Sequence, residues 1–217
     1  MTYNVNYFFI SGKVGSGKDT VAEYIINNKI DRLTHVKFAY ADELKSILFH
    51  GGWNGKKDLA GRKLLQEVGA AFRKYNEDTW VNLVFDKILN VIALPTNTNH
   101  DINILITDCR YINELYGMIQ KLSNLPHIGK NVNYYWIYID GINHDPNREM
   151  DKDTLSSQSE TELAGSIDSL LHSNVTKLDL GNNTILNIEY IENNGTITEL
   201  YDKIDLVFKM HEELNNG

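Results

Sequence analysis

One short stretch of the sequence constrains the fold more than any other. An apolar run at residues 8–10 leads into a glycine-rich loop that ends in Gly-Lys at residues 17 and 18, and apolar residues with helical spacing follow. Glycine lets successive backbone N–H groups turn toward one centre, and the N-terminus of the next helix adds a partial positive charge. The stretch therefore has the properties of a phosphate-binding P-loop between a strand and a helix.

The P-loop supplies candidate nucleotide-binding residues. We expect its backbone N–H groups and the Lys18 ammonium to hold the phosphates of ATP or a similar nucleotide. The expected residues are Gly12, Gly15, Ser16, Gly17, Lys18, Asp19 and Thr20. A P-loop usually has Ser or Thr directly after its lysine as a Mg²⁺ ligand, whereas here Asp19 precedes Thr20. A glycine-rich turn that binds no ligand is the alternative, and the flanking strand and helix patterns argue against it.

Composition limits the class of protein. The 217 residues, 42% of them hydrophobic, are enough for one substantial core, and we expect a single domain, residues 1–217. A formal net charge of −8 argues against a protein that binds DNA or RNA. Cys109 is the only cysteine, which excludes a disulfide within the chain. No signal-like start and no long apolar run occur, so we expect a cytoplasmic protein that does not interact with membranes.

Apolar runs alternate with helical patterns along the chain. Candidate strands are residues 7–10, 36–38, 102–107, 134–139 and 185–191, and candidate helices are 20–27, 41–49, 62–72, 79–94, 112–122 and a last one that opens at 196. Polar segments at 96–101, 141–157 and 173–184 are expected to be loops, the second long enough to be a lid. This order predicts an α/β fold, a three-layer sandwich with a parallel sheet of about five strands flanked by helices.

A carboxylate is expected beside the P-loop. The apolar run 104–107 ends in Asp108, which places an acidic side chain at the C-terminal edge of a parallel sheet, where it can orient Mg²⁺ or its waters. Strands also end in Asp because it caps the next element, so this assignment depends on the neighbouring P-loop.

Arginines are few, and phosphate sites use them as planar, permanently charged donors. The chain has five: Arg32, Arg62, Arg73, Arg110 and Arg148. Arg110 follows Asp108 by two residues, so we expect it at the same sheet edge. For Arg62 and Arg73 a functional and a surface position are equally supported, Arg148 lies in the expected lid, and Arg32 is expected at the surface.

Several short motifs, taken in order, resemble one family. They are Ser-Gly at 11–12 with Gly-Ser-Gly-Lys-Asp-Thr at 15–20, Lys-Phe-Ala at 37–39, Asp-Glu-Leu-Lys at 42–45, Leu-Leu-Gln-Glu-Val-Gly at 64–69 with Trp-Val at 80–81, Asp-Cys-Arg at 108–110 with Glu114, Ser-Glu-Thr-Glu-Leu at 159–163, and Asn-Asn-Gly-Thr at 193–196 before Glu-Leu at 199–200. Together they resemble the viral, bacteriophage-type deoxynucleoside monophosphate kinases of the P-loop NMP-kinase superfamily. Gly-Ser-Gly-Lys-Asp-Thr is the most specific motif, and it includes the unusual aspartate.

The resemblance implies a P-loop kinase fold and a phosphotransferase that uses ATP and Mg²⁺ to convert a deoxynucleoside monophosphate to the diphosphate. It implies an NMP-binding insertion at about 40–95 and a lid at about 140–160.

The implied catalytic residues are Lys18, Arg110 and Arg148, and the implied Mg²⁺ ligands come from Thr20, Asp108 and Asp19. The implied substrate-binding residues are Asp42, Lys45, Arg62, Gln66, Arg73 and Arg110. No catalytic base is required, because the acceptor phosphate is already ionised at neutral pH. The resemblance also allows a homodimer.

The sequence departs from the family at the expected lid. Such kinases often carry an arginine after the strand that ends near residue 139, but this chain has Asp140, and Arg148 is the expected replacement. Two other functions therefore stay open. One is a P-loop kinase for another small acceptor, such as dephospho-coenzyme A or phosphomevalonate, and the other is an ATP-binding protein without transferase activity.

Overall fold

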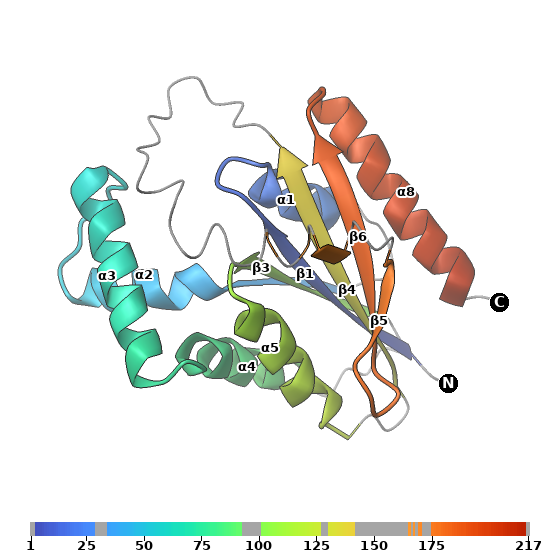
Figure 1. Ribbon diagram of the computed structural model, residues 1–217, viewed down its shortest axis with the longest axis horizontal. Coiled ribbons are helices and arrows are strands. Elements are labelled where there is room, and N and C mark those ends of the chain that lie inside the picture. The colour runs from blue at the N-terminus through green and yellow to red at the C-terminus, as the bar shows by residue number, and fades with distance from the viewer. Residues whose placement is uncertain are drawn as a thin grey trace.

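The computed structural model of the chain describes residues 3–28, 34–92, 101–126, 130–141 and 175–215, together with 165, 167, 169 and 170. Its elements are, in order, β1 (Tyr3–Gly12), α1 (Lys18–Asn28), β2 (Thr34–Ala39), α2 (Tyr40–His50), α3 (Leu59–Tyr75), α4 (Thr79–Ile92), β3 (Ile102–Cys109), α5 (Ile112–Ser123), β4 (Lys130–Gly141), β5 (Lys177–Asp179), β6 (Ile185–Asn193) and α8 (Ile197–Asn215). A six-stranded sheet with the order β2-β3-β1-β4-β6-β5 lies at the centre (Figure 1).

The α/β fold and the parallel sheet predicted from the sequence are confirmed. β1 pairs in parallel with β3 and β4, β2 pairs in parallel with β3, and β4 with β6. The sheet has one strand more than the five expected, because β5 pairs antiparallel with β6 inside the segment 173–184 that we expected to be a loop. β5 has only three residues, two of them exposed, so it lacks the apolar run that identified the other strands.

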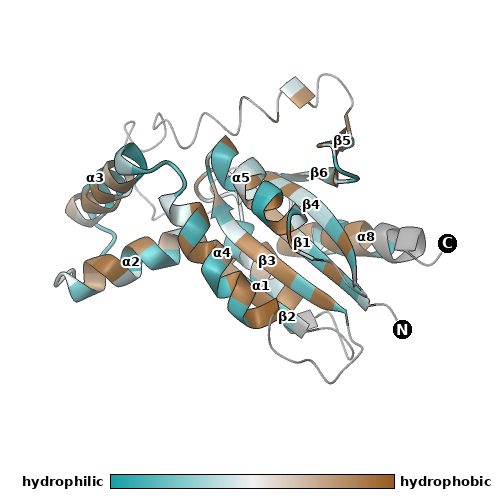
Figure 2. Ribbon diagram, turned by 90° about the horizontal axis from the view of Figure 1, so that it is seen from below, coloured by the Kyte–Doolittle hydropathy of each residue, from teal (hydrophilic) through white to brown (hydrophobic). Residues whose placement is uncertain are grey.

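Helices cover both faces of the sheet. Along β1, Phe8 and Ile10 pack in one core with α1 and α8, while Tyr7 and Phe9 pack in a second core with α4 and α5. Successive side chains of a strand point to opposite faces, so the apolar run at residues 7–10 supplies both cores. The central strands are accordingly rich in hydrophobic residues (Figure 2). Helices α2 and α3 extend to one side of this sandwich (Figure 1).

The chain follows the expected helix boundaries closely. Thr196 and Glu199 form a capping box at the start of α8, where the last helix was expected to open. Thr196 N donates to Glu199 Oε2 over 2.6 Å, and Glu199 N donates to Thr196 Oγ1 over 3.3 Å. Most of the expected lid, with Arg148, lies outside the described residues, as does Arg32. In the described parts of the chain no helix combines the length and the hydropathy needed to cross a bilayer.

A row of asparagines fixes the strand register. Asn6 pairs in register with Asn103 on β3 and with Asn133 on β4. Its Nδ2 donates to Asn103 Oδ1 over 2.8 Å, and its Oδ1 accepts from Asn133 Nδ2 over 2.9 Å. Asn103 is only 1% exposed. Since a buried amide without partners is costly, this row stabilises the observed alignment of three strands against a shifted one.

The asparagine row leads to a prediction about stability. Asn6→Ala removes two hydrogen bonds and leaves the buried Asn103 amide without one of its partners, so we expect the free energy of unfolding to fall by about 1–3 kcal/mol. Urea denaturation measures the change. Asn131→Ala is the matched control, because Asn131 makes an exposed hydrogen bond to Asn4 at the end of the same sheet. Equal losses in the two variants would contradict the role assigned to Asn6.

Candidate active site

A cavity of about 940 Å³ lies between the P-loop, helices α2 and α3, and the end of β3. Most of the residues expected to bind nucleotide, acceptor or metal line it: Gly15, Gly17, Lys18, Asp19, Thr20, Asp42, Lys45, Arg62, Gln66, Arg73, Asp108 and Arg110. The fold thus brings together residues that the sequence places almost a hundred positions apart. Gly12 and Ser16 are not part of the cavity wall, and Arg148 lies outside the described residues.

The P-loop backbone depends on two glycines with positive φ. Gly12 has φ +142°, and a Cβ there would lie 2.1 Å from the Ile139 carbonyl oxygen of β4. Gly17 has φ +99°, and a Cβ there would lie 2.7 Å from Asn193 Nδ2, which also donates to the Ser16 carbonyl over 2.9 Å. Both the conformation and the space therefore require glycine. The loop is held against the ends of β4 and β6.

Lys18 lies under the loop. Its Nζ donates to the carbonyl oxygens of Gly12, over 2.5 Å, and Lys13, over 2.6 Å, and the residue is 8% exposed. Ser16 is fully buried, and its Oγ has no hydrogen-bond partner within the described structure. The two carbonyls hold the ammonium against the P-loop. A loop of this kind with its lysine suits a polyphosphate.

Asp108 is displaced from the regular pairing of β1 and β3. Ile10 pairs with Thr107 and Ser11 pairs with Cys109, so Asp108 is the extra residue of a β-bulge, and its φ is +59°. A left-handed conformation costs a non-glycine residue about 1–2 kcal/mol, and such strain is common where a side chain is redirected toward a site. Here the bulge places Asp108 on the cavity wall.

Basic side chains surround the Asp108 carboxylate. The nearest is Arg110, whose Nη2 lies 3.6 Å from Asp108 Oδ1. Burial alone would raise the pKa of Asp108, but the positive charges of Arg110, Lys18, Lys45 and Lys57 hold that pKa below its usual value. Asp108 is therefore ionised at neutral pH and can act as an anionic ligand.

The residues expected to hold Mg²⁺ are few and separate. Asp19 has a 77% exposed side chain 3.8 Å from Lys37 Nζ, and Thr20 and Asp108 line the same cavity. Among the described residues no group of three or more His, Cys, Asp or Glu side chains is arranged to hold a metal ion. Mg²⁺ at nucleotide sites takes one or two protein ligands and completes its shell with phosphates and water. The chemistry of these three side chains fits a Mg²⁺ that enters with a nucleotide.

One face of α3 carries the residues that we expected to bind the phosphate acceptor. Arg62, Gln66, Ala70 and Arg73 line the cavity at spacings of four, four and three residues, as one face of a helix requires. Arg62 Nε donates to the Lys57 carbonyl over 2.9 Å. On α2, Lys45 Nζ lies 2.7 Å from Asp42 Oδ1.

The cavity includes residues to which sequence analysis gave no role: Lys37, Lys57, Tyr111, Glu114 and Asn193. Glu114, Asn193 and Lys37 belong to the motifs that carry the family resemblance, so that resemblance could have identified them as candidate site residues. Tyr111 follows Arg110 directly. Lys57 lies in the loop before α3, where no periodicity indicates which side chain faces inward.

Glu114 is a buried carboxyl in the wall of the cavity, with 3% of its side chain exposed. Burial raises its pKa to about 7, although hydrogen bonds from the backbone N–H groups of Arg110 and Tyr111 and the positive charge of Arg73 oppose the shift. A carboxyl that titrates near neutrality beside two arginines is a pattern found at functional sites.

The sequence matches no protein-family model, and no curated protein is significantly similar to it. Solved structures with a similar course of the chain include a shikimate kinase from Bacteroides thetaiotaomicron, 12% identical, with a TM-score of 0.43 over 95% of this chain and 98% of that one. They also include an unliganded sugar kinase from Janibacter sp. HTCC2649, 15% identical, with a TM-score of 0.40 over 94% of this chain and 92% of that one. Similarity at this level assigns the chain to neither enzyme's family.

The glycine geometry leads to a prediction about ATP binding. In Gly17→Ala the loop still needs a positive φ, which a Cβ disfavours, and the Cβ would displace the Asn193 side chain. We therefore expect ATP affinity to fall at least about tenfold, a loss of about 1.4 kcal/mol. Isothermal titration calorimetry measures it. Gly52→Ala is the control, because Gly52 has φ +93° with nothing within 4 Å of its Cβ position. ATP affinity within twofold of wild type in Gly17→Ala would contradict the assigned role of the loop.

The pKa of Glu114 leads to a prediction about stability and pH. With a folded pKa of about 7 against an ordinary value of 4.5, Glu114 binds more protons in the folded than in the unfolded state between these values. Its contribution is therefore complete below about pH 4.5 and is lost as the pH rises to 7. Glu114→Gln removes this titration, so the free energy of unfolding of the variant should rise relative to wild type over that range and then level off.

Urea denaturation at several pH values tests this expectation. Glu67→Gln supplies the reference curve, because Glu67 is the same residue type with 64% of its side chain exposed on α3. Parallel curves for Glu114→Gln and Glu67→Gln would contradict the burial effect.

Proposed function

We propose that the protein is a kinase that transfers the γ-phosphoryl group of ATP, with Mg²⁺, to a deoxynucleoside monophosphate. The observation that supports this most is the second group of cations in the cavity. Beyond Lys18 of the P-loop, the same cavity is lined by Lys45, Arg62, Arg73 and Arg110. A protein that binds ATP alone needs only the P-loop, whereas a second phosphate-bearing ligand needs a second cationic wall.

The charge of the cavity supports two anionic ligands. Seven lysines and arginines and four carboxylates line it, an excess of three positive charges when all are ionised, although the whole chain carries a formal charge of −8. Phosphoryl transfer brings two polyanionic groups together, so charge compensation from fixed cations is the main contribution that such an enzyme makes.

The remaining wall suits a nucleobase. Tyr40, Leu44, Leu65 and Trp80 are apolar or aromatic lining residues on the side of α2, α3 and α4. Gln66 lies among them, and its amide offers both a donor and an acceptor to a base edge. These helices occupy the stretch between β2 and β3, within the proposed NMP-binding insertion at about 40–95.

Each group has a defined task in the proposed reaction. Lys18 exchanges its bonds to the Gly12 and Lys13 carbonyls for phosphate oxygens of ATP. Arg110, near the P-loop, and Arg73, on α3, hold the acceptor phosphate in line with the transferred group. Mg²⁺, held through Thr20, Asp19 or Asp108, supplies charge compensation on the phosphates when bound. The acceptor phosphate oxygen is already ionised, so no residue needs to remove a proton. Arg148, in the proposed lid, completes this assignment.

A coupled assay of ADP release tests the proposal. The acceptors are the deoxynucleoside and ribonucleoside monophosphates, dephospho-coenzyme A and phosphomevalonate, each with Mg²⁺ and ATP. We expect turnover with a subset of the deoxynucleoside monophosphates and a loss of at least about a hundredfold in kcat in Lys18→Ala. Turnover only with another acceptor would replace the substrate class, and ATP binding without turnover of any acceptor would indicate a non-catalytic binder.

The acceptor side is tested separately by Arg62→Ala. Because Arg62 lines the cavity on α3, its removal should raise the KM of the acceptor about tenfold while the KM of ATP changes less than about twofold. Lys63→Ala is the matched control, since Lys63 is the next residue on the same helix and 73% of its side chain is exposed. Equal effects of the two substitutions would contradict the placement of the acceptor against α3.

A further inference from the structure

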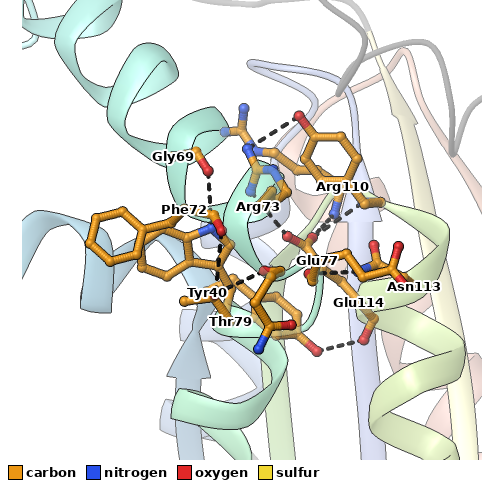
Figure 3. Close-up of polar contacts among 12 residues, drawn as sticks. Tyr40, Gly69, Phe72, Arg73, Glu77, Thr79, Arg110, Asn113 and Glu114 are labelled. Atoms are coloured by element: carbon orange, nitrogen blue, oxygen red, sulfur yellow. Dashed lines mark hydrogen bonds and ion pairs between the residues drawn. The ribbon is translucent and has the colours of Figure 1, made fainter.

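Glu114 connects three elements that border the cavity. It lies in the first turn of α5, directly after the end of β3, and its side chain is almost fully buried. Figure 3 shows its carboxylate reaching from α5 toward Arg73 of α3 and Arg110. A buried carboxylate without partners is strongly unfavourable, so the groups around it are needed for its ionised form.

One oxygen of Glu114 fixes the backbone at the end of β3. Glu114 Oε2 accepts hydrogen bonds from the N–H groups of Arg110, over 2.8 Å, and Tyr111, over 3.2 Å. The Glu114 carbonyl in turn accepts from the buried Tyr40 hydroxyl over 2.6 Å, which ties the start of α5 to the start of α2. The direction in which Arg110 leaves the sheet edge is thereby set by the Glu114 side chain.

The other oxygen faces Arg73. Glu114 Oε1 lies 3.6 Å from Arg73 Nη1, and Arg73 Nη2 donates to the Tyr111 hydroxyl over 3.2 Å. The Arg73 guanidinium also lies 4.1 Å above the centre of the Tyr111 ring. With 23% of its side chain exposed, Arg73 still reaches the cavity. Glu114 and Tyr111 use only part of its five N–H donors, so the others remain for a ligand.

We propose that Glu114 is a positioning residue for the acceptor, one that holds Arg73 and the backbone of Arg110 so that both guanidinium groups bind the acceptor phosphate together. The inference rests on the proposed function. It adds one requirement to that function. Arg73 lies on α3 and Arg110 follows β3, so α3 and the sheet edge must be fixed relative to each other before both arginines can bind one phosphate. Glu114 supplies that link because it contacts both.

A positioning role and a purely structural role predict different effects on the binding of the two substrates. Loss of the Glu114 charge removes the ion pair with Arg73 and weakens the hydrogen bonds from the Arg110 and Tyr111 N–H groups, while the P-loop is held by separate contacts to Ile139 and Asn193. Acceptor binding should therefore weaken without a matching change in ATP binding. A merely structural residue would change both, or neither.

The test compares the four proteins of a double-mutant cycle, which are wild type, Arg73→Ala, Glu114→Gln and the double variant. Glu67→Gln is a fifth protein, the exposed control on α3. With the deoxynucleoside monophosphates that wild type converts, we expect Glu114→Gln to raise the KM of the acceptor at least about tenfold and that of ATP less than about twofold. The double variant should have an acceptor KM above that of Arg73→Ala but well below the product of the two single effects, because Glu114 acts partly through Arg73 and partly through the Arg110 backbone. Equal effects on both substrates, or effects of the two substitutions that multiply, would overturn the inference.

A second measurement needs no ligand. The urea midpoints of the same four proteins report whether Glu114 and Arg73 interact in the free protein, and the inference requires that the two shifts are not additive. Additive shifts overturn it, even if the enzyme proves to be the proposed kinase. If the shifts are non-additive and wild type converts none of the acceptors, the proposed function fails while the link between Glu114 and Arg73 stands. Should Glu114→Gln fail to fold, Glu114→Asp replaces it in both measurements, because the shorter side chain keeps the charge but withdraws the carboxylate from Arg73 and the Arg110 N–H group. Additive shifts or equal substrate effects in that cycle overturn the inference as well.

Discussion

The close approach of the P-loop backbone to the ends of β4 and β6 is the contact on which the rest of the site depends. Gly12 lies against the Ile139 carbonyl, Gly17 lies against Asn193, and a Cβ on Gly141 would lie 2.8 Å from the Asn193 carbonyl oxygen. Gly12, Gly17 and Gly141 have no room for a Cβ where these segments meet, and the Asn193 side chain of β6 fills the space beside Gly17. This packing fixes the P-loop backbone, against which Lys18 then lies.

The cavity is lined by more cations than carboxylates, although the whole chain is acidic. Three of the carboxylates that line it each lie beside a basic side chain: Asp108 beside Arg110, Asp42 beside Lys45, and Glu114 beside Arg73. Each pair holds a basic side chain in place and lowers the repulsion between neighbouring cations when no anion is bound. The cations are thus preorganised, which reduces the cost of ordering them when a phosphate enters.

Sequence patterns predicted most of the sheet because buried parallel strands are continuous apolar runs, as in β1, β3 and β4. They missed β5, whose three mostly exposed residues are ordered by pairing with β6 and by little else. In the site, the P-loop could be predicted because its glycine requirement is local. Arg62, Gln66 and Arg73 came from the family resemblance, and their common face of α3 was found only in the structure. The bulge at Asp108 could not be predicted, since a register shift between β1 and β3 arises from pairing across ninety-odd residues. The partner of Glu114 was hidden for the same reason: Arg73 and Glu114 share no element, and only the fold brings them together.

Several departures from local rules lie together at the sheet edge, while Asn182 and Asn183, in the turn before β6, also have positive φ. Asp108 adopts a left-handed backbone, Gly12 and Gly17 adopt positive φ, and Glu114 is a carboxyl buried to the point that its pKa rises to about 7. Each is unfavourable alone, and a chain under selection only for stability would replace them with a regular strand end and an apolar residue. Their common effect is to direct donors, a carboxylate and two guanidinium groups toward one volume. Such costs around one cavity are the pattern expected where selection for a binding or catalytic site, and not for stability alone, has fixed the residues.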